Sequence, residues 1–366
     1  MNTANQPLRT QVITSLEALY ALREPLIALV AATGALVFHH PAFLFPWSRA
    51  AVINGMKPNC IGLWRGTELV GFAPLFVKRD KRALLARRLS PPLYGSSPPF
   101  DILLTCDERA GIAAMGQAVL RQSWLDQTFP STLTESRFAT VWPDWFASQG
   151  FSIERTTGLG FMAVQIDGKP EEVFAFAHGR QRKEIGRLAR RTAAEARHEV
   201  YQSGAPLQPA LDNMAHVIRS SWKHSTEMKG KGLSALIDLA RSLDEAGLLV
   251  LDFVFYQDKP IAYMLEILDP SGTRHAYHNA FDAAQKWLSP GVVILHAAVK
   301  QASMDGLKHY DYWGNRPYIG RLSNAMRPNV SVRIVNNGLL HLGQLSALKL
   351  LARGKNKTKV ETADHD

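Results

Sequence analysis

The segment from Tyr277 to Gly291, YHNAFDAAQKWLSPG, has the residue types and spacing best suited to holding an anion. Ser289, Pro290 and Gly291 stand directly before the apolar run VVILHAAV, which predicts the start of a helix. Proline suits a first helical turn and Ser289 could cap it, so free N–H groups and the positive end of the helix dipole could hold a pyrophosphate. Gly291 would let a phosphate approach the backbone. The same residues could equally do no more than cap a helix.

The elements that must position this segment are alternating helices and strands in the second half of the chain. Apolar spacing predicts helices over 170–197, from about 206 to 222, over 232–245 and over 291–304. Alternating runs predict strands over 248–256, 261–269, 275–279 and 309–313. The segment 280–290 is expected to be a loop between a strand and a helix.

The first half of the chain also mixes helices and strands. Helices are predicted over 15–38 and 111–129, and strands over 60–64, 69–77 and 160–166. The Pro-, Gly- and Ser-rich run SPPLYGSSPP at 90–99 predicts a loop. These elements predict an α/β (α+β) protein with two domains, 1–167 and 168–348, followed by a basic tail over 349–366 that is expected to be disordered.

Composition limits the classes of function. The chain has 366 residues, 46% of them hydrophobic and 20% charged, which fits a folded protein of about two domains. Cys60 and Cys106 show no metal-ligand spacing, so we expect no metal and a reducing, cytoplasmic location. The apolar run 25–38 is short for a membrane span. The net charge of +10 favours anionic partners, with the inner membrane surface as an alternative location.

Several catalytic signatures are absent from the sequence. It contains no Gly-x-x-x-x-Gly-Lys-Ser/Thr, no Gly-x-Gly-x-x-Gly, no His-Glu-x-x-His and no Gly-x-Ser-x-Gly. P-loop nucleotide hydrolysis, zinc proteolysis and an α/β-hydrolase triad therefore lose their usual support.

A succession of motifs resembles one family. The first half has HHPAFLFPW, IGLWRGTELVGFAPLF and SSPPFDILL; the second has Trp222-Lys223, YHNAFD, LSPG and HYDYWGNRPYIG. This order is similar to the CelD-like (cellulose biosynthesis-type) GNAT acetyltransferases, which are related to the Fem peptidyltransferases. The resemblance implies two tandem GNAT-like domains, each a mixed, mostly antiparallel sheet flanked by helices.

The resemblance implies acyl-CoA, with acetyl-CoA foremost, as the donor to an amine acceptor. The family's phosphate motif, Gln/Arg-x-x-Gly-x-Gly/Ala, matches this chain at Lys286, Ser289 and Gly291, and Ser289 replaces its first glycine. The implied acyl-CoA site consists of Lys286, Ser289, Pro290, Gly291 and Val292. The family's Tyr-Lys pair is replaced here by Tyr318–Ile319, which removes the lysine.

Transfer from a thioester to an amine needs a proton acceptor, a polarised carbonyl and an acid for the departing thiolate. Asp282 and Asp311 are the candidate bases and Tyr318 is the candidate acid, although each could be purely structural. A backbone N–H between 275 and 279 on a splayed strand could polarise the carbonyl. The expected pocket residues are Trp222, His278 and Trp313, which could also be ordinary packing.

Two other functions stay open. A Fem-like transferase would take its group from aminoacyl-tRNA. A catalytically silent module would bind within a polysaccharide-assembly system, because the family is linked to exopolysaccharide and the phosphate motif is degenerate.

Two basic stretches could also bind anions. One is 180–197, with seven Lys and Arg, and the other is 78–88, which is expected to be a loop after a strand. Neither stretch interleaves aromatic residues, so nucleic acid is not an expected partner outside the tRNA alternative. Both could instead be solvated surface.

Overall fold

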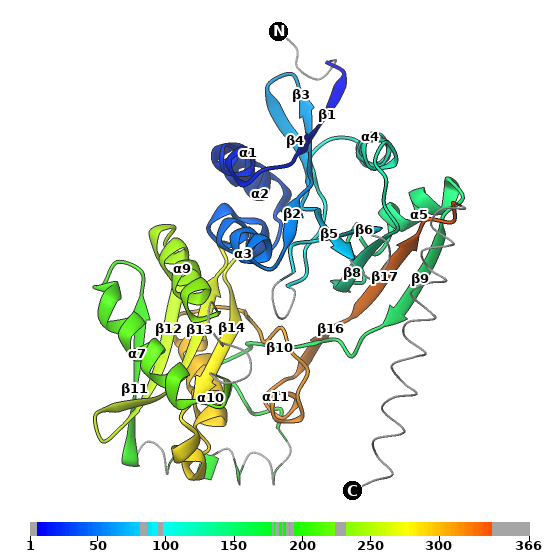
Figure 1. Ribbon diagram of the computed structural model, residues 1–366. Coiled ribbons are helices and arrows are strands. Elements are labelled where there is room, and N and C mark those ends of the chain that lie inside the picture. The colour runs from blue at the N-terminus through cyan, green and yellow to red at the C-terminus, as the bar shows by residue number, and fades with distance from the viewer. Residues whose placement is uncertain are drawn as a thin grey trace, which may run out of the picture. The chain divides into compact units, whose positions relative to one another are not determined.

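The computed structural model of the chain describes residues 6–80, 86–93, 98–177, 194–223 and 232–338, together with single positions between 179 and 190. The chain forms two compact units that alternate along the sequence. Unit 1 contains residues 1–35, 47–158 and 329–366, and unit 2 contains residues 36–46 and 159–328. The colour in Figure 1 runs by residue number, so the segments of each unit can be followed along the chain. The tail over 349–366 and half of the basic stretch 180–197 lie outside the described residues.

Unit 1 is built on two sheets with the strand orders β1-β3-β4-β7 and β2-β5-β6-β8-β17-β9. Its strands are β1 (Leu8–Ile13), β2 (Met56–Pro58), β3 (Cys60–Arg65), β4 (Glu68–Ala73), β5 (Phe76–Asp80), β6 (Ala86–Ser90), β7 (Leu103–Leu104), β8 (Asp126–Leu133), β9 (Ser152–Thr157) and β17 (Asn329–Val335). Its helices are α1 (Leu16–Tyr20), α2 (Arg23–Thr33), α4 (Glu108–Leu120) and α5 (Val141–Ser148). Helices α4 and α5 pack over a core that includes Trp124, Phe138 and Trp142.

Unit 2 is built on one seven-stranded sheet with the order β11-β12-β13-β14-β15-β10-β16. Its strands are β10 (Phe161–Gln165), β11 (Ala196–Gln202), β12 (Leu249–Tyr256), β13 (Lys259–Leu268), β14 (Thr273–Phe281), β15 (His309–Asp311) and β16 (Ala325–Arg327). Its helical elements are η2 (Val37–His39), α7 (Leu207–Ser220), α9 (Gly232–Glu245), η3 (Ala283–Leu288), α10 (Pro290–Met304) and α11 (Pro317–Gly320). A further helix, α3 (Pro41–Ile53), begins in unit 2 and ends in unit 1.

Helices cover both faces of the unit 2 sheet (Figure 1). Helix α10 packs on Val254, Ala262 and Met264, and these residues share one apolar core. Because side chains alternate along a strand, Tyr263 and Leu265 point to the other face, where α7 and α9 pack. The expected α/β class, with mixed and mostly antiparallel sheets flanked by helices, is confirmed.

The division of the chain differs from the expected cut after residue 167. Strand β10 pairs with β15 and β16 and so belongs to unit 2. Strand β17 pairs with β8 and β9 and returns the chain to unit 1. Both assignments depend on pairing between residues more than 100 positions apart, which local spacing does not report.

Several expected element bounds were wrong for local reasons. The helix expected over 15–38 stops at Thr33 because Gly34 adopts the left-handed conformation, with φ of 58°. The strand expected over 69–77 is divided at Pro74, which has no N–H to donate to a ladder. The helix expected over 111–129 ends at Leu120, and its last residues form β8 instead. The expected loop at 78–88 contains the ends of β5 and β6, which pair with each other.

Candidate functional site

Strands β14 and β15 part in the middle of the unit 2 sheet. They are parallel, and they pair only between Thr273–His275 and His309–Asp311. Strand β14 continues for six more residues to Phe281, whereas β15 ends at Asp311. The carboxyl half of β14 therefore has no partner on its β15 side among the described strands. Such an end leaves main-chain groups available to a ligand.

A β-bulge lies on β14 just after this parting. Leu265 of β13 is opposite His278, but its neighbour Glu266 is opposite Ala276. Tyr277 is therefore the extra residue, and a bulge of this kind bends the strand and re-aims its main chain. The bulge falls inside 275–279, the range predicted from the sequence to supply a carbonyl-polarising N–H.

Helix α10 begins one short turn after β14. Ser289 is its N-cap residue, with a left-handed φ of 53°, and its side chain makes no capping hydrogen bond, contrary to expectation. The N–H groups of Val292 and Val293 both donate to the Ser289 carbonyl, at 3.0 and 3.2 Å. Among the described residues, the Gly291 N–H has no backbone acceptor. The helix start therefore offers one free amide together with the helix dipole.

The space around Gly291 suits an anion that approaches the backbone. A Cβ built there would meet only the ring of Phe281, with its nearest atom at 3.3 Å. Lys286 lies exposed in η3, and its carbonyl accepts the N–H of Ser289 at 3.0 Å. The expected acyl-CoA residues Lys286 to Val292 thus share one corner, and Pro290 occupies the first helical position, where no N–H is needed.

Asp311 lies buried at the point where β14 and β15 part. Its Oδ2 accepts a hydrogen bond from Arg327 at 3.1 Å and lies 3.5 Å from Nδ1 of His275. Burial raises the pKa of Asp311, but His275 and Arg327 outweigh burial and hold that pKa below its ordinary value. Asp311 is therefore an ionised anchor at neutral pH.

His275 and Trp313 join the same cluster. The Trp313 indole N–H points at Nδ1 of His275 at 2.9 Å, and it can donate there only while that nitrogen carries no proton. Burial lowers the pKa of His275, but the carboxylates of Asp269 and Asp311 outweigh burial and raise it. The Trp313 indole and the Asp311 carboxylate compete for Nδ1. The contact to the indole, at 2.9 Å, is shorter than the contact to the carboxylate, at 3.5 Å.

Trp313 is held in a conformation that non-glycine residues rarely adopt, with φ of 46°. Its ring makes edge contacts with Phe38 and Phe161, and the Arg327 guanidinium lies 5.2 Å from its centre. Backbone strain of this kind persists only where the surroundings over-determine it.

The other two candidate acid–base residues do not touch this cluster in the structure. Asp282 precedes η3 and accepts the N–H of Ala284 at 3.0 Å, so it acts as a helix cap. Tyr318 lies exposed on α11. The structure thus brings Asp311 and Trp313 together around His275, and it leaves Asp282 at the start of η3 and Tyr318 on α11.

His278 follows the bulge and bonds to Tyr263, with 2.5 Å between the tyrosine oxygen and Nδ1. Its other ring nitrogen, Nε2, is buried and has no hydrogen-bond partner. Burial, helped by the charge of Lys223, lowers the pKa of His278 to about 3. Trp222 is 52% exposed, and the neighbouring Lys223 donates to the Asn279 carbonyl at 2.8 Å.

The side chains of His275, Tyr263 and Arg327 are not among the site residues predicted from the sequence, and Lys223 has no predicted role. Tyr263 could have been suspected because it stands within the apolar run IAYML, and His275 because it shares one short strand with Arg274 and His278. Arg327 could not, because it reaches Asp311 only through the pairing of β16 with β10.

A row of buried charges crosses the same sheet on the α10 face. His198 contacts Asp252 at 2.6 Å, and Arg274 contacts Glu266 at 3.3 Å. Arg274 also reaches Asp305 of α10, and the Tyr310 hydroxyl donates to Glu266. Burial, together with the negative charge of Asp252, raises the pKa of Glu266 well above its ordinary value. The row joins five strands at the end where β14 and β15 still pair.

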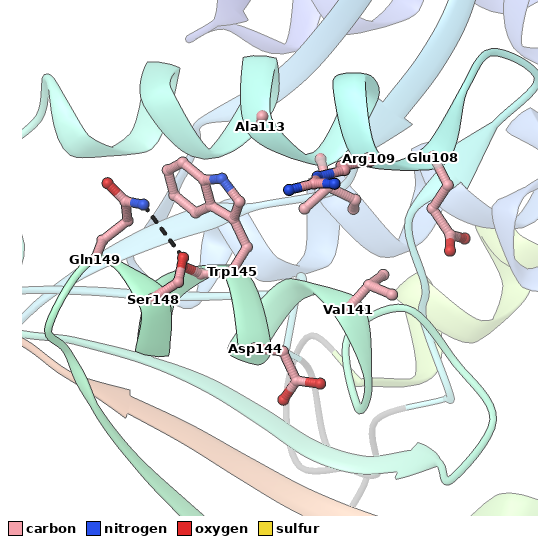
Figure 2. A pocket seen from close by; sticks show the side chains of 9 residues that line it. Glu108, Arg109, Ala113, Val141, Asp144, Trp145, Ser148 and Gln149 are labelled. Carbon is pink, nitrogen blue, oxygen red and sulfur yellow. Dashed lines mark hydrogen bonds between the residues drawn. The ribbon is translucent and has the colours of Figure 1, made fainter.

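A separate pocket of about 450 Å³ lies between α4 and α5 in unit 1. Figure 2 shows Trp145 and Arg109 in this pocket, flanked by Glu108 and Asp144. The indole of Trp145 packs against α4 at Gly116, where any Cβ would clash with it. None of the expected site residues lines this pocket.

Comparisons with known proteins place the bulge and α10 inside a recognised domain. Residues 179–318 match the family model of an acetyltransferase (GNAT) domain. The structure of FemX superposes with a TM-score of 0.59 at 13% identity and covers 90% of this chain and 98% of that chain. A conserved protein of unknown function from Bacteroides thetaiotaomicron gives a TM-score of 0.55 at 11% identity and covers 90% and 100%. A search of curated proteins finds no match.

The GNAT part of the sequence expectation is confirmed for 179–318, and the structural similarity to FemX extends across both units. At these identities the structural likeness concerns the fold alone. Among the described residues there is no cluster of potential metal ligands and no helix long and apolar enough to span a membrane.

Proposed function

We propose that unit 2 transfers an acyl group from acyl-CoA, acetyl-CoA foremost, to an amine in the cytoplasm. The observation that carries this proposal is the bulge at Tyr277, which lies where β14 leaves β15, on the strand that leads through η3 into α10. The match of 179–318 to an acetyltransferase (GNAT) domain supports the same class of reaction. The resemblance to the CelD-like acetyltransferases favours acetyl-CoA as the donor and an amine as the acceptor.

The corner from Lys286 to Val292 would hold the pyrophosphate of the donor. The Gly291 N–H, the positive end of α10 and the exposed Lys286 ammonium all favour negative charge there. The main chain at the bulge would face the acyl carbonyl and stabilise its developing negative charge.

The transfer proceeds by direct attack in a ternary complex. The amine nitrogen bonds to the thioester carbonyl carbon, its proton passes to a base, and the carbon–sulfur bond breaks as the thiolate takes a proton. Asp282 is our proposed base, because it lies at the surface beside the donor corner, and Tyr318 is our proposed acid. Asp311 is less suited to accept a proton, since its pKa is lowered, and we give it the role of holding His275 and Arg327.

The acceptor pocket in this proposal consists of Trp222, His278 and Trp313. Trp222 is exposed, whereas Trp313 is fixed by His275 and Phe38. Trp222 follows α7, His278 lies within β14 and Trp313 follows β15, so we place the three residues around the half of β14 that has no partner strand.

Initial-rate kinetics with acetyl-CoA and a panel of amines test this reaction, with release of the free thiol as the signal. Direct attack predicts intersecting double-reciprocal lines and no free thiol without an amine. We expect Asp282→Asn to lower kcat by about 10²–10⁴-fold, as for loss of a general base, with KM for acetyl-CoA little changed. Parallel lines, or full activity in Asp282→Asn, would contradict the mechanism.

A Fem-like transfer from aminoacyl-tRNA is the second candidate, and similarity to FemX over both units supports it. It predicts tRNA binding with a steep dependence on salt and no thermal shift with acyl-CoA.

A silent module of a polysaccharide-assembly system is the third candidate function, because Ser289 is strained and offers no side-chain cap. A silent module predicts neither tRNA binding nor a thermal shift with acyl-CoA.

A further inference from the structure

The end of the β5–β6 ribbon in unit 1 places like charges directly opposite one another. Its register sets Lys78 against Arg88 and Arg79 against Arg87. Like charges that face each other across an antiparallel pair destabilise that pair. Two such pairs in succession therefore weaken the ribbon unless an anion neutralises them.

The protein itself places little negative charge beside these basic residues. Arg88 lies 3.8 Å from the Asp126 carboxylate, which Arg333 already contacts at 2.7 Å. Within the part of the chain that the structure describes, no ion pair joins Lys78, Arg79 or Arg87 to a carboxylate. Lys78 and Arg79 are exposed and Arg87 is half-buried. Three cations are thus available to an external partner.

The ribbon end also extends beyond the strands on either side of it. Strand β2 pairs with β5 only as far as Lys78, and β8 pairs with β6 only at Arg88 and Leu89. Within the described strands, positions 79, 80, 86 and 87 therefore have ladder partners only among themselves, and the Leu125 N–H also donates to the Arg87 carbonyl at 2.8 Å. Because side chains alternate, Lys78 and Arg88 lie on one face of the ribbon, and Arg79 and Arg87 lie on the other. The end of the ribbon carries positive charge on both faces.

This arrangement fits a layer of anions that surrounds the ribbon end better than a partner that contacts one face. A nucleic acid would present its phosphates to one face and would gain from aromatic stacking, but residues 78–88 contain no aromatic side chain. The headgroup region of an anionic bilayer would neutralise both faces at once. We propose that the end of the β5–β6 ribbon docks this protein on an anionic phospholipid surface.

Co-sedimentation of the full chain with vesicles tests this proposal. We expect binding to vesicles of phosphatidylglycerol and phosphatidylcholine, weakening as salt rises, and no binding to phosphatidylcholine alone. Each basic residue near such a surface strengthens binding about fivefold, so Arg79→Gln with Arg87→Gln should weaken it about 25-fold. This double variant also removes an opposed pair of cations, so its Tm should not fall.

The matched control is Arg9→Gln with Arg121→Gln, which removes the same charge from two exposed arginines elsewhere in unit 1. The proposal expects this control to keep binding within about twofold of the unaltered chain, since surface charge acts within about a Debye length. Equal losses in both double variants would mean that net charge alone drives binding and would overturn the proposal. Failure of the unaltered chain to bind vesicles that contain phosphatidylglycerol would also overturn it. So would an Arg79→Gln with Arg87→Gln chain that loses binding to tRNA but keeps its binding to these vesicles.

Discussion

His278 shows how one buried residue can link the candidate site to pH. Its Nδ1 bonds to the Tyr263 hydroxyl, its Nε2 has no partner, and Lys223 adds an unfavourable charge to any protonated form. The folded protein therefore keeps His278 neutral, with its pKa lowered to about 3 from an ordinary 6.5.

Because the pKa of His278 is lowered in the folded protein, the free energy of unfolding must change with pH in a definite direction. Below about pH 6.5 the unfolded chain binds a proton at His278, whereas the folded chain does not. The free energy of unfolding therefore falls as the pH drops toward 3. We expect His278→Asn to lack this loss, which amounts to at most about 1.4 kcal/mol per pH unit. Urea unfolding of both chains from about pH 8 to about pH 5 measures the difference. Parallel stability curves would contradict the assigned protonation state.

The strands of unit 2 are joined by the buried charged row, and Arg274 is its central member. Arg274 contacts Glu266, Asp305 and, at 3.9 Å, Asp252, and it is 1% exposed. The row lies where β14 and β15 still pair, so it fixes the point from which these strands part.

Removing the cation alone should be costly. We expect Arg274→Met to destabilise unit 2 by about 3–5 kcal/mol, because it leaves buried carboxylates without their counter-charge. Tyr310→Phe should cost only about 1–3 kcal/mol, because it removes a single donor to Glu266. Thermal or urea unfolding gives both values. An Arg274→Met chain as stable as the unaltered one would show that the row contributes no such support.

Local elements were predictable where a short sequence signal decides them. Ser-Pro-Gly places the start of α10 within one residue, and the alternation around His275 finds β14. The bulge at Tyr277 was not predictable, because it is a property of register between two strands. Nor was the end of α2 at Gly34, since glycine occurs both within and after helices.

At the scale of the molecule, the sequence indicated two units of one fold class but not how the chain divides between them. Strands β10 and β17 each pair outside the half in which they occur, and pairing at long separation leaves no periodic trace in the sequence. The candidate site was predicted in part for the same reason. The corner from Lys286 to Val292 is contiguous in sequence, whereas His275, Asp311 and Arg327 meet only through the sheet.

The claim on which the proposed function rests is that the start of α10 binds the pyrophosphate of a CoA thioester. Calorimetric titration of acetyl-CoA into the full chain tests it. We predict saturable binding that Gly291→Glu lowers at least about tenfold, because the new side chain brings bulk and negative charge to the free Gly291 amide. Gly291→Ala should bind within a few-fold of the unaltered chain, since its Cβ meets only the Phe281 ring. Equal affinity in a folded Gly291→Glu chain, or no binding to the unaltered chain, would contradict the account.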